Sequence, residues 1–135
     1  MRINWNNIDT VLLDMDGTLL DLHFDNFFWL NYLPKRYAEI HNIPFKTAND
    51  QIHNLYIKTT GTLNWYSTTY WSKELSVDIY RLNKEISGLI KMRPFAQEFL
   101  EQLGLHKKKR VLVTNAHPQS LELKISVTQI NSLLD

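Results

Sequence analysis

The 135-residue chain contains no cysteine, which excludes disulfide bonds and thiolate metal sites and is typical of a reducing cytoplasm. It also lacks an excess of one charge, since 15 basic and 14 acidic residues leave a net charge of +1. No overall field therefore favours nucleic acid or an anionic membrane. No apolar run is long enough to span a bilayer, and the first residues lack the apolar core of a secretory signal. We therefore expect a cytoplasmic protein with no nucleic-acid or membrane partner.

Apolar residues make up 44% of the chain, which is enough for one domain with a modest core. The aromatic residues, 12% of the total, are concentrated between Phe24 and Tyr80. This concentration is the first indication that the chain has two parts.

Two short apolar runs predict buried, parallel strands at residues 10–14 and 110–114. Before the second strand, Pro94 is expected to open a helix that Gly104 closes. After that strand, Pro118 suits the first turn of a last helix. The predicted order is strand, helical insert, helix, strand and helix.

The insert, residues 25–90, is predicted to be a small bundle of about four helices joined by short links. Its apolar residues recur at helical spacing, and Pro34 is expected to end or kink the first helix. Polar residues are placed where they can cap helix N-termini. These candidate caps are Asp25, Thr47, Asn64 and Asp78.

Two carboxylates, Asp14 and Asp16, leave the first strand on a turn that contains Gly17. Residues at i and i+2 of an extended chain point the same way, and open α/β sheets bind ligands at the carboxyl ends of their strands. Asp14 suits a nucleophile that attacks phosphorus, and Asp16 suits an acid/base that protonates the leaving alkoxide and then activates water. The hydroxyl of Thr114 and the backbone N–H of Asn115 are expected to donate to phosphoryl oxygens.

Such a site needs positive charge. A carboxylate about 4 Å from a dianionic phosphate repels it by about 8 kcal/mol at an effective dielectric constant near 20. Mg²⁺, a cationic side chain or both must offset this repulsion. The carboxylate of Asp14 and the backbone carbonyl of Asp16 are hard oxygen ligands, which suit Mg²⁺.

Residues 14–21, Asp-Met-Asp-Gly-Thr-Leu-Leu-Asp, resemble the first motif of the haloacid dehalogenase (HAD) superfamily, and residues 111–115 resemble its second motif. The helical insert lies where that family carries a helical cap of the C1 type. Residues 62–66 and 114–118 are similar to bacterial GMP/IMP nucleotidases of this superfamily. The resemblance covers essentially the whole chain, but only the amino-terminal part of such a protein.

The resemblance implies an α/β fold with an incomplete Rossmann-type core of parallel strands and an inserted helical cap. The core would comprise residues 1–22 and 92–135, and the cap residues 23–91. Family members also carry a third-motif lysine and a fourth-motif acidic pair, for which the residues after the second motif offer no counterpart. Lys124 lies there, but its place in the predicted last helix argues against the role of catalytic lysine.

The same resemblance assigns the nucleophile to Asp14, the general acid/base to Asp16 and the phosphate-binding hydroxyl to Thr114. Mg²⁺ is the implied cofactor, with Asp14 and Asp16 as its ligands. We therefore expect a Mg²⁺-dependent phosphomonoesterase that forms an aspartyl-phosphate. Its expected substrate is a purine nucleoside 5′-monophosphate such as GMP or IMP, a preference that comes from the resemblance alone.

Other functions stay open at this point. A sugar-phosphate mutase shares the first two motifs, whereas haloacid dehalogenation fits less well because it does not use an acid such as Asp16. From a different class, the chain would be a non-catalytic fragment. Its two-stranded sheet would then associate with a second copy or with a missing carboxyl-terminal half.

Several side chains have structural interpretations beside the functional ones. Asp21 is expected to shape the loop, and His117 to serve the entry into the last helix. The basic residues 107–110 are expected to form a solvated loop. The aromatic residues of the insert are expected to be mostly bundle core, with one of them able to stack on a purine. These are Trp29, Trp65, Tyr66, Tyr70 and Trp71.

Overall fold

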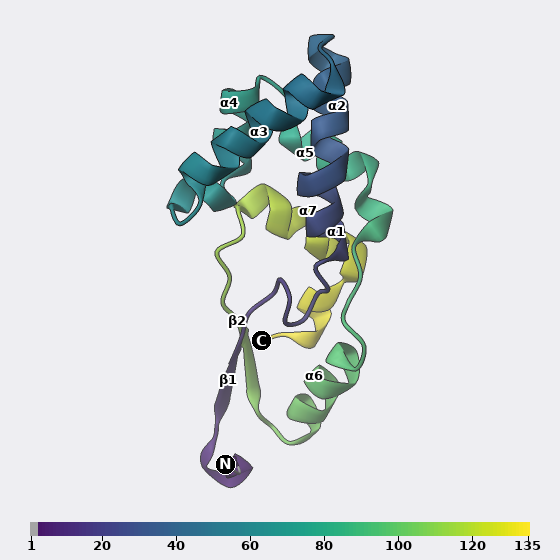
Figure 1. Ribbon diagram of the computed structural model, residues 1–135. Coiled ribbons are helices and arrows are strands. Elements are labelled where there is room, and N and C mark those ends of the chain that lie inside the picture. The colour runs from purple at the N-terminus through teal and green to yellow at the C-terminus, as the bar shows by residue number, and fades with distance from the viewer. Residues whose placement is uncertain (1–2) are drawn as a thin grey trace.

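The computed structural model describes residues 3–135. In chain order the elements are η1 (Trp5–Asn7), β1 (Thr10–Leu13), α1 (His23–Phe27), η2 (Phe28–Tyr32), α2 (Leu33–His41), α3 (Phe45–Thr59), η3 (Leu63–Tyr66), α4 (Thr68–Leu75), α5 (Ile79–Glu85), η4 (Ser87–Leu89), α6 (Ala96–Leu105), β2 (Lys109–Leu112), α7 (Pro118–Thr128) and η5 (Ile130–Leu133). Helices α1–α5 gather at one end of the molecule, the strands and α6 lie toward the other, and α7 lies between them (Figure 1). None of the described helices is both long and apolar enough to cross a membrane.

Strands β1 and β2 pair in parallel, as predicted, with Thr10 opposite Lys109 and Leu13 opposite Leu112. A further hydrogen bond, from Val113 N to Leu13 O at 2.8 Å, continues the pairing by one residue. Both strands end earlier than expected, because the chain turns into loops before Asp14 and Thr114. The carboxyl ends of the two strands therefore meet at one edge of the sheet, facing α7 and the helical bundle (Figure 1).

The first helical stretch differs from the prediction in two ways. Asp25 lies inside α1 and does not cap it, because the helix already begins at His23 after Leu22. Pro34 does not end the helical stretch, since it stands in the first turn of α2, which continues directly from η2. The preceding η2 is a π-helical turn. It accommodates a proline, which has no N–H and crowds the carbonyl four residues earlier.

Among the other predicted caps, Asp78 is confirmed, since its carboxylate accepts from Arg81 N at 2.9 Å at the start of α5. Thr47 is not a cap, because α3 begins earlier, directly after Pro44. Asn64 is not one either, because it lies in the short helix η3. The hydroxyl of Ser67 caps α4 instead, accepting from Tyr70 N at 3.1 Å.

The return segment follows the prediction more closely. Pro118 stands in the first turn of α7, and the side chain of His117 caps that helix by accepting from Gln119 N at 3.3 Å. Helix α6 begins at Ala96, two residues after Pro94, and runs through Gly104 before it ends at Leu105. Gly104 therefore does not close the helix.

Two hydrophobic clusters support the proposed division into core and cap. One lies around the bundle helices, with Trp71 and Phe28 each 1% exposed. The other joins the turn after β1 to α6 and α7, and includes Met15 at 0% exposure. Phe24 and Ile90 come from the predicted cap but belong to this second cluster. The boundaries at residues 22 and 92 remain a proposal.

Candidate active site

The turn after β1 is held by its own backbone. The carboxylate of Asp14 accepts from Met15 N at 2.8 Å, and Met15 O accepts from Leu19 N and Leu20 N at 3.0 and 2.9 Å. Gly17 has φ +78°, a conformation that a residue with a Cβ rarely adopts, and its N–H donates to Leu20 O at 2.8 Å. The fully buried side chain of Met15 anchors the turn. The turn is thereby fixed at the sheet edge, with an aspartate on each side of Met15.

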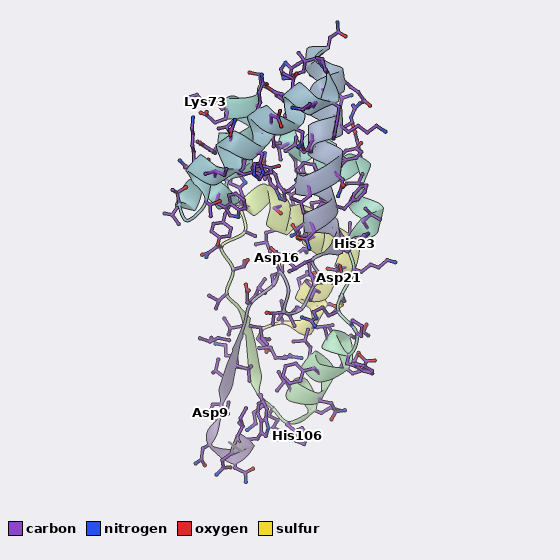
Figure 2. All side chains as sticks on the ribbon, viewed as in Figure 1. Asp9, Asp16, Asp21, His23, Lys73 and His106 are labelled. Atoms are coloured by element: carbon purple, nitrogen blue, oxygen red, sulfur yellow. The ribbon has the colours of Figure 1, made fainter. Side chains whose placement is uncertain are left out.

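A pocket of about 270 Å³ lies between this edge and the bundle. Of the four predicted site residues, Asp16 lines it, whereas Asp14, Thr114 and Asn115 do not. Figure 2 places Asp16 near the middle of the molecule, far from Asp9 at the other end of the strands. The structure therefore brings one predicted site residue to a cavity.

The predicted phosphate donors lie on the loop after β2. The hydroxyl of Thr114 accepts from Ala116 N at 3.1 Å, so it shapes its own loop while its proton stays available to a ligand. Asn115 is exposed. Strand register sets this loop beside the turn that carries Asp14, but no described hydrogen bond joins Thr114 to either aspartate. Their joint role remains a prediction.

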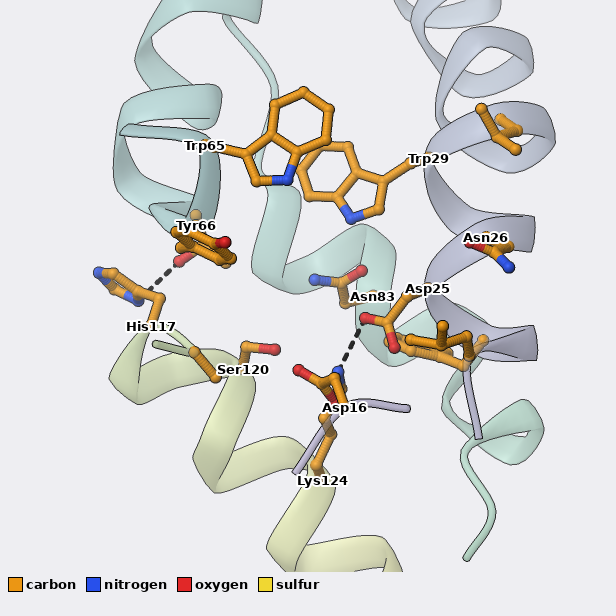
Figure 3. Close-up of a pocket in the computed structure, with 15 residues that line it drawn as sticks. Asp16, Asp25, Asn26, Trp29, Trp65, Tyr66, Asn83, His117, Ser120 and Lys124 are labelled. Atoms are coloured by element: carbon orange, nitrogen blue, oxygen red, sulfur yellow. Dashed lines mark hydrogen bonds and ion pairs between the residues drawn. The ribbon is translucent and has the colours of Figure 1, made fainter. Parts of the chain in front are cut away.

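Lys124 is the residue that sequence reasoning left out. Its ammonium lies 2.6 Å from Asp16 Oδ1 and 2.7 Å from Asp25 Oδ1, and its side chain is 2% exposed (Figure 3). The contact to Asp16 spans 108 residues of sequence, which no local pattern reveals. One signal was available, because His117, Ser120 and Lys124 are spaced by three and four residues. All three line the pocket, His117 from the N-cap of α7 and the other two from the helix itself.

The Asp25 carboxyl lies in an environment that disfavours its charged form. Burial raises its pKa above the ordinary value, although the Lys124 ammonium opposes that shift. Its second oxygen, Oδ2, is buried without a hydrogen-bond partner, as is Oδ1 of Asn83 on the same pocket wall. Two polar side chains of the bundle thus face the site with unmet hydrogen-bonding capacity.

The bundle supplies the apolar side of the pocket. Trp29 and Trp65 face the Asp16–Lys124 pair across it (Figure 3). Both also pack on Trp71, whose Nε1–H donates to Trp65 O at 2.9 Å. Trp71 is bundle core, as expected, whereas Trp29 and Trp65 are partly core and partly pocket wall.

Two further structural interpretations are confirmed. Asp21 shapes the loop, because its carboxylate accepts from His23 N at 2.9 Å. His117 caps α7, and its Nδ1 also lies 2.8 Å from the hydroxyl of Thr68 in α4. This contact ties the bundle to α7 beside the pocket.

Comparison with curated proteins finds the chain 40% identical over 135 residues to GMP/IMP nucleotidase YrfG of Escherichia coli (strain K12), and equally so to the Shigella flexneri protein of that name. Each alignment covers 100% of this chain and 61% of the relative. A HAD phosphatase from Thermococcus onnurineus has a TM-score of 0.80 at 20% identity, over 95% of this chain and 60% of that one. A protein assigned as a β-phosphoglucomutase from Thermotoga maritima has a TM-score of 0.60 at 17% identity, over 95% and 59%. No protein-family model matches the chain.

The sequence match spans the whole chain, both motifs included, and the structural match gives the HAD fold independently. The chain is similar over its whole length to these nucleotidases and has the fold of HAD phosphatases. The predicted α/β fold of the HAD type is thereby confirmed. The chain spans 61% of the length of the curated relatives that it matches.

HAD phosphatases generally use Mg²⁺. Among residues 3–135, no group of three or more His, Cys, Asp or Glu side chains is placed to hold a metal ion. Two donors of the kind that Mg²⁺ prefers are present: the carboxylate of Asp14, and the carbonyl of Asp16, to which no described backbone N–H donates. Mg²⁺ often binds through one or two carboxylates and keeps several waters, so these two donors fit the metal in kind.

Proposed function

We propose that the protein hydrolyses phosphate monoesters and that its substrates are purine nucleoside 5′-monophosphates such as IMP and GMP. The supporting observation is the position of Asp16, which faces a pocket between the sheet edge and the cap. The nucleotide preference is supported by 40% identity to a GMP/IMP nucleotidase. A cytoplasmic location stays a prediction from the sequence.

In the proposed reaction, a carboxylate oxygen of Asp14 bonds to phosphorus while the bond from phosphorus to the ester oxygen breaks. Asp16 gives its proton to the departing alkoxide. In the second half, Asp16 takes a proton from water as the water oxygen bonds to phosphorus and the aspartyl-phosphate bond breaks. The hydroxyl of Thr114 and the N–H of Asn115 donate to phosphoryl oxygens in both halves. Free phosphate leaves, and both aspartates return to their starting states.

Charge balance determines what else the site needs. Mg²⁺, held by the Asp14 carboxylate and the Asp16 carbonyl, would supply positive charge against the phosphate when bound. The Lys124 ammonium offsets the negative charge of Asp25, and that of Asp16 once Asp16 has given up its proton. The repulsion between Asp14 and the phosphate is then the part left for the metal to offset.

The cap wall supports a planar, aromatic substrate group. Trp29 and Trp65 lie across the pocket from Asp16, so a phosphate near the sheet edge would leave a base near their rings (Figure 3). Indole rings bind purines by stacking, which offers no choice between bases. The proposal therefore assigns purine binding to this wall and leaves the choice of base to polar groups.

The test is the release of inorganic phosphate from IMP and GMP by the purified chain in the presence of Mg²⁺. We expect turnover that Asp14→Asn abolishes, because an amide cannot form the aspartyl-phosphate. Asp9→Asn is the matched control, since Asp9 is an exposed aspartate at the far end of β1 (Figure 2). Wild-type turnover that survives in Asp14→Asn would refute the assigned nucleophile, and no turnover by the wild type would refute the proposed activity.

A second proposal rests on the exposed sheet. Leu12 and Val113 are 68% and 54% exposed, and the described sheet has two strands. Apolar side chains on so small a sheet favour pairing with another chain. We propose self-association, which sedimentation equilibrium tests directly. A monomer at all concentrations would contradict it, and Leu12→Lys should weaken any dimer that forms.

A further inference from the structure

We propose that Lys124 is a positioning residue that, together with Asp25 of the cap, fixes the carboxylate of Asp16 for proton transfer. This inference rests on the proposed phosphatase activity. Lys124 lies within the helix that follows the second motif. Neither the motifs nor the comparisons assign a role to its side chain.

Packing alone does not account for the Lys124 ammonium. A side chain that is 2% exposed carries a charge out of water, which is costly even when the charge is paired. Apolar residues of similar volume often serve a core as well or better than a buried ion pair. The network also leaves Oδ2 of Asp25 without a partner, which adds to its cost. A charged network kept at such a cost suggests a role in the site.

The carboxylate of Asp16 depends on Lys124 for its position. It is 30% exposed and lies on a turn, and Lys124 supplies the one hydrogen bond described for it within residues 3–135. That bond engages Oδ1, and no described hydrogen bond engages Oδ2. Without the ammonium, the carboxylate could rotate freely toward water.

The ammonium is itself fixed from several sides. Asp25 in α1 holds it at 2.7 Å, and it lies 5.6 Å from the centre of the Phe24 ring. Asp16 is thus tied through Lys124 to both the cap and α7, so the cap must be seated for the acid/base to be in place.

In the reaction, the proton that Oδ2 of Asp16 gives to the leaving alkoxide oxygen leaves a carboxylate behind. The ammonium lies beside that negative charge throughout, and the proton returns to Oδ2 from water in the second half. Lys124 forms and breaks no covalent bond. It acts through Asp16, so its removal should lower kcat and leave KM for the nucleotide nearly unchanged.

The absence of cysteine from the chain allows a sharp test. Lys124→Cys introduces a single thiol, and alkylation with 2-bromoethylamine in denaturant, followed by refolding, restores an ammonium at nearly the length of lysine. We expect Lys124→Cys and Lys124→Met to lower kcat for IMP by at least ~30-fold and to change KM by less than ~3-fold. Aminoethylation of Lys124→Cys should recover at least about a third of the wild-type kcat if charge and position are what matter.

The controls separate this role from folding. Lys46→Cys, treated in the same way, is the matched control, because Lys46 is 90% exposed in an ion pair on α3. Asp25→Asn removes one anchor of the ammonium and should lower kcat by a smaller factor than Lys124→Met, which keeps the inference testable if the latter fails to fold. A double-mutant cycle of Asp16→Asn with Lys124→Met should show coupling of at least ~twofold in the folding equilibrium constant.

The outcomes are distinct. If the wild type is active and the kcat of Lys124→Met lies within ~3-fold of the wild-type value, the inference is overturned and the proposed function stands. Folded Lys124→Cys that stays inactive after aminoethylation would overturn it as well, as would coupling below ~twofold in the cycle. A wild type without phosphatase activity would overturn the proposed function, and the positioning role with it, while the cycle would still report the contact.

Discussion

Lys124→Met removes the ammonium that lies 2.7 Å from Oδ1 of Asp25 and leaves that carboxylate in a site where its side chain is 24% exposed. Oδ2 of Asp25 has no partner even in the wild type, so both oxygens become unpaired. Removing one partner of a buried ion pair costs about 3–5 kcal/mol. Asp16 is 30% exposed, can turn toward water and should add little to this cost. We therefore expect Lys124→Met to lower the free energy of unfolding by about 3–5 kcal/mol.

Adding Asp25→Leu to Lys124→Met removes the stranded charge. We expect the double variant to recover to within about 1 kcal/mol of the wild-type free energy of unfolding, because apolar pairs often replace buried ion pairs without loss. Urea unfolding followed by tryptophan fluorescence measures both variants. A double variant as unstable as the single one would refute the reasoning, since the network would then be needed for the fold itself.

Three further predictions concern the turn, the cap and the surface. Gly17→Ala should lower the free energy of unfolding by about 1–2 kcal/mol and should also lower turnover, because φ is +78° and the new Cβ would lie 3.3 Å from a methyl carbon of Leu22. Urea unfolding and the phosphate-release assay test this. Trp71→Phe should lower the free energy of unfolding by about 1–3 kcal/mol in the same assay, because the carbonyl of Trp65 loses its hydrogen-bond donor, the Trp71 Nε1–H. Hydrogen bonds from the guanidinium and backbone N–H of Arg110 lower the pKa of the Asp135 carboxyl to about 2, so Arg110→Gln should move it toward 3.8 in a carbon NMR titration. Because this pKa is depressed, the pairing stabilises the fold above pH 3.8, and its contribution disappears as the pH falls through about 2. An unchanged value in Arg110→Gln would contradict the assignment.

Local signals predicted the parts of the fold that depend on neighbouring residues. The apolar runs gave both strands and the proline at 118 gave the start of α7, because strand burial and proline geometry act within a few residues. Asp78 was recognisable as a cap for the same reason. The prediction that Thr47 caps a helix was wrong, because α3 already begins directly after Pro44. Here the proline, and not the threonine, marks the start of the helix.

The site was harder to predict, because its contacts join distant segments. Asp25 looked like a helix cap, yet its carboxylate pairs with Lys124, 99 residues away. Lys124 looked like an ordinary helical lysine, yet α7 buries it against the turn of Asp16. Asp16, which the first motif singled out, lines a pocket because the end of a strand fixes such a turn, and its catalytic role stays a prediction. The cation that pairs with Asp16 is determined by how the cap and α7 pack together. No single segment of the sequence encodes that packing.

The most direct test of the central claim is to trap the covalent intermediate on Asp14. The chain is mixed with IMP and Mg²⁺, quenched in acid and reduced with borohydride, which converts an aspartyl-phosphate to homoserine. Peptide mass spectrometry then identifies the modified residue. The account predicts homoserine at position 14, formed only with nucleotide present and absent from Asp14→Asn. Phosphate release without modification at position 14, or modification of another carboxylate, would contradict it.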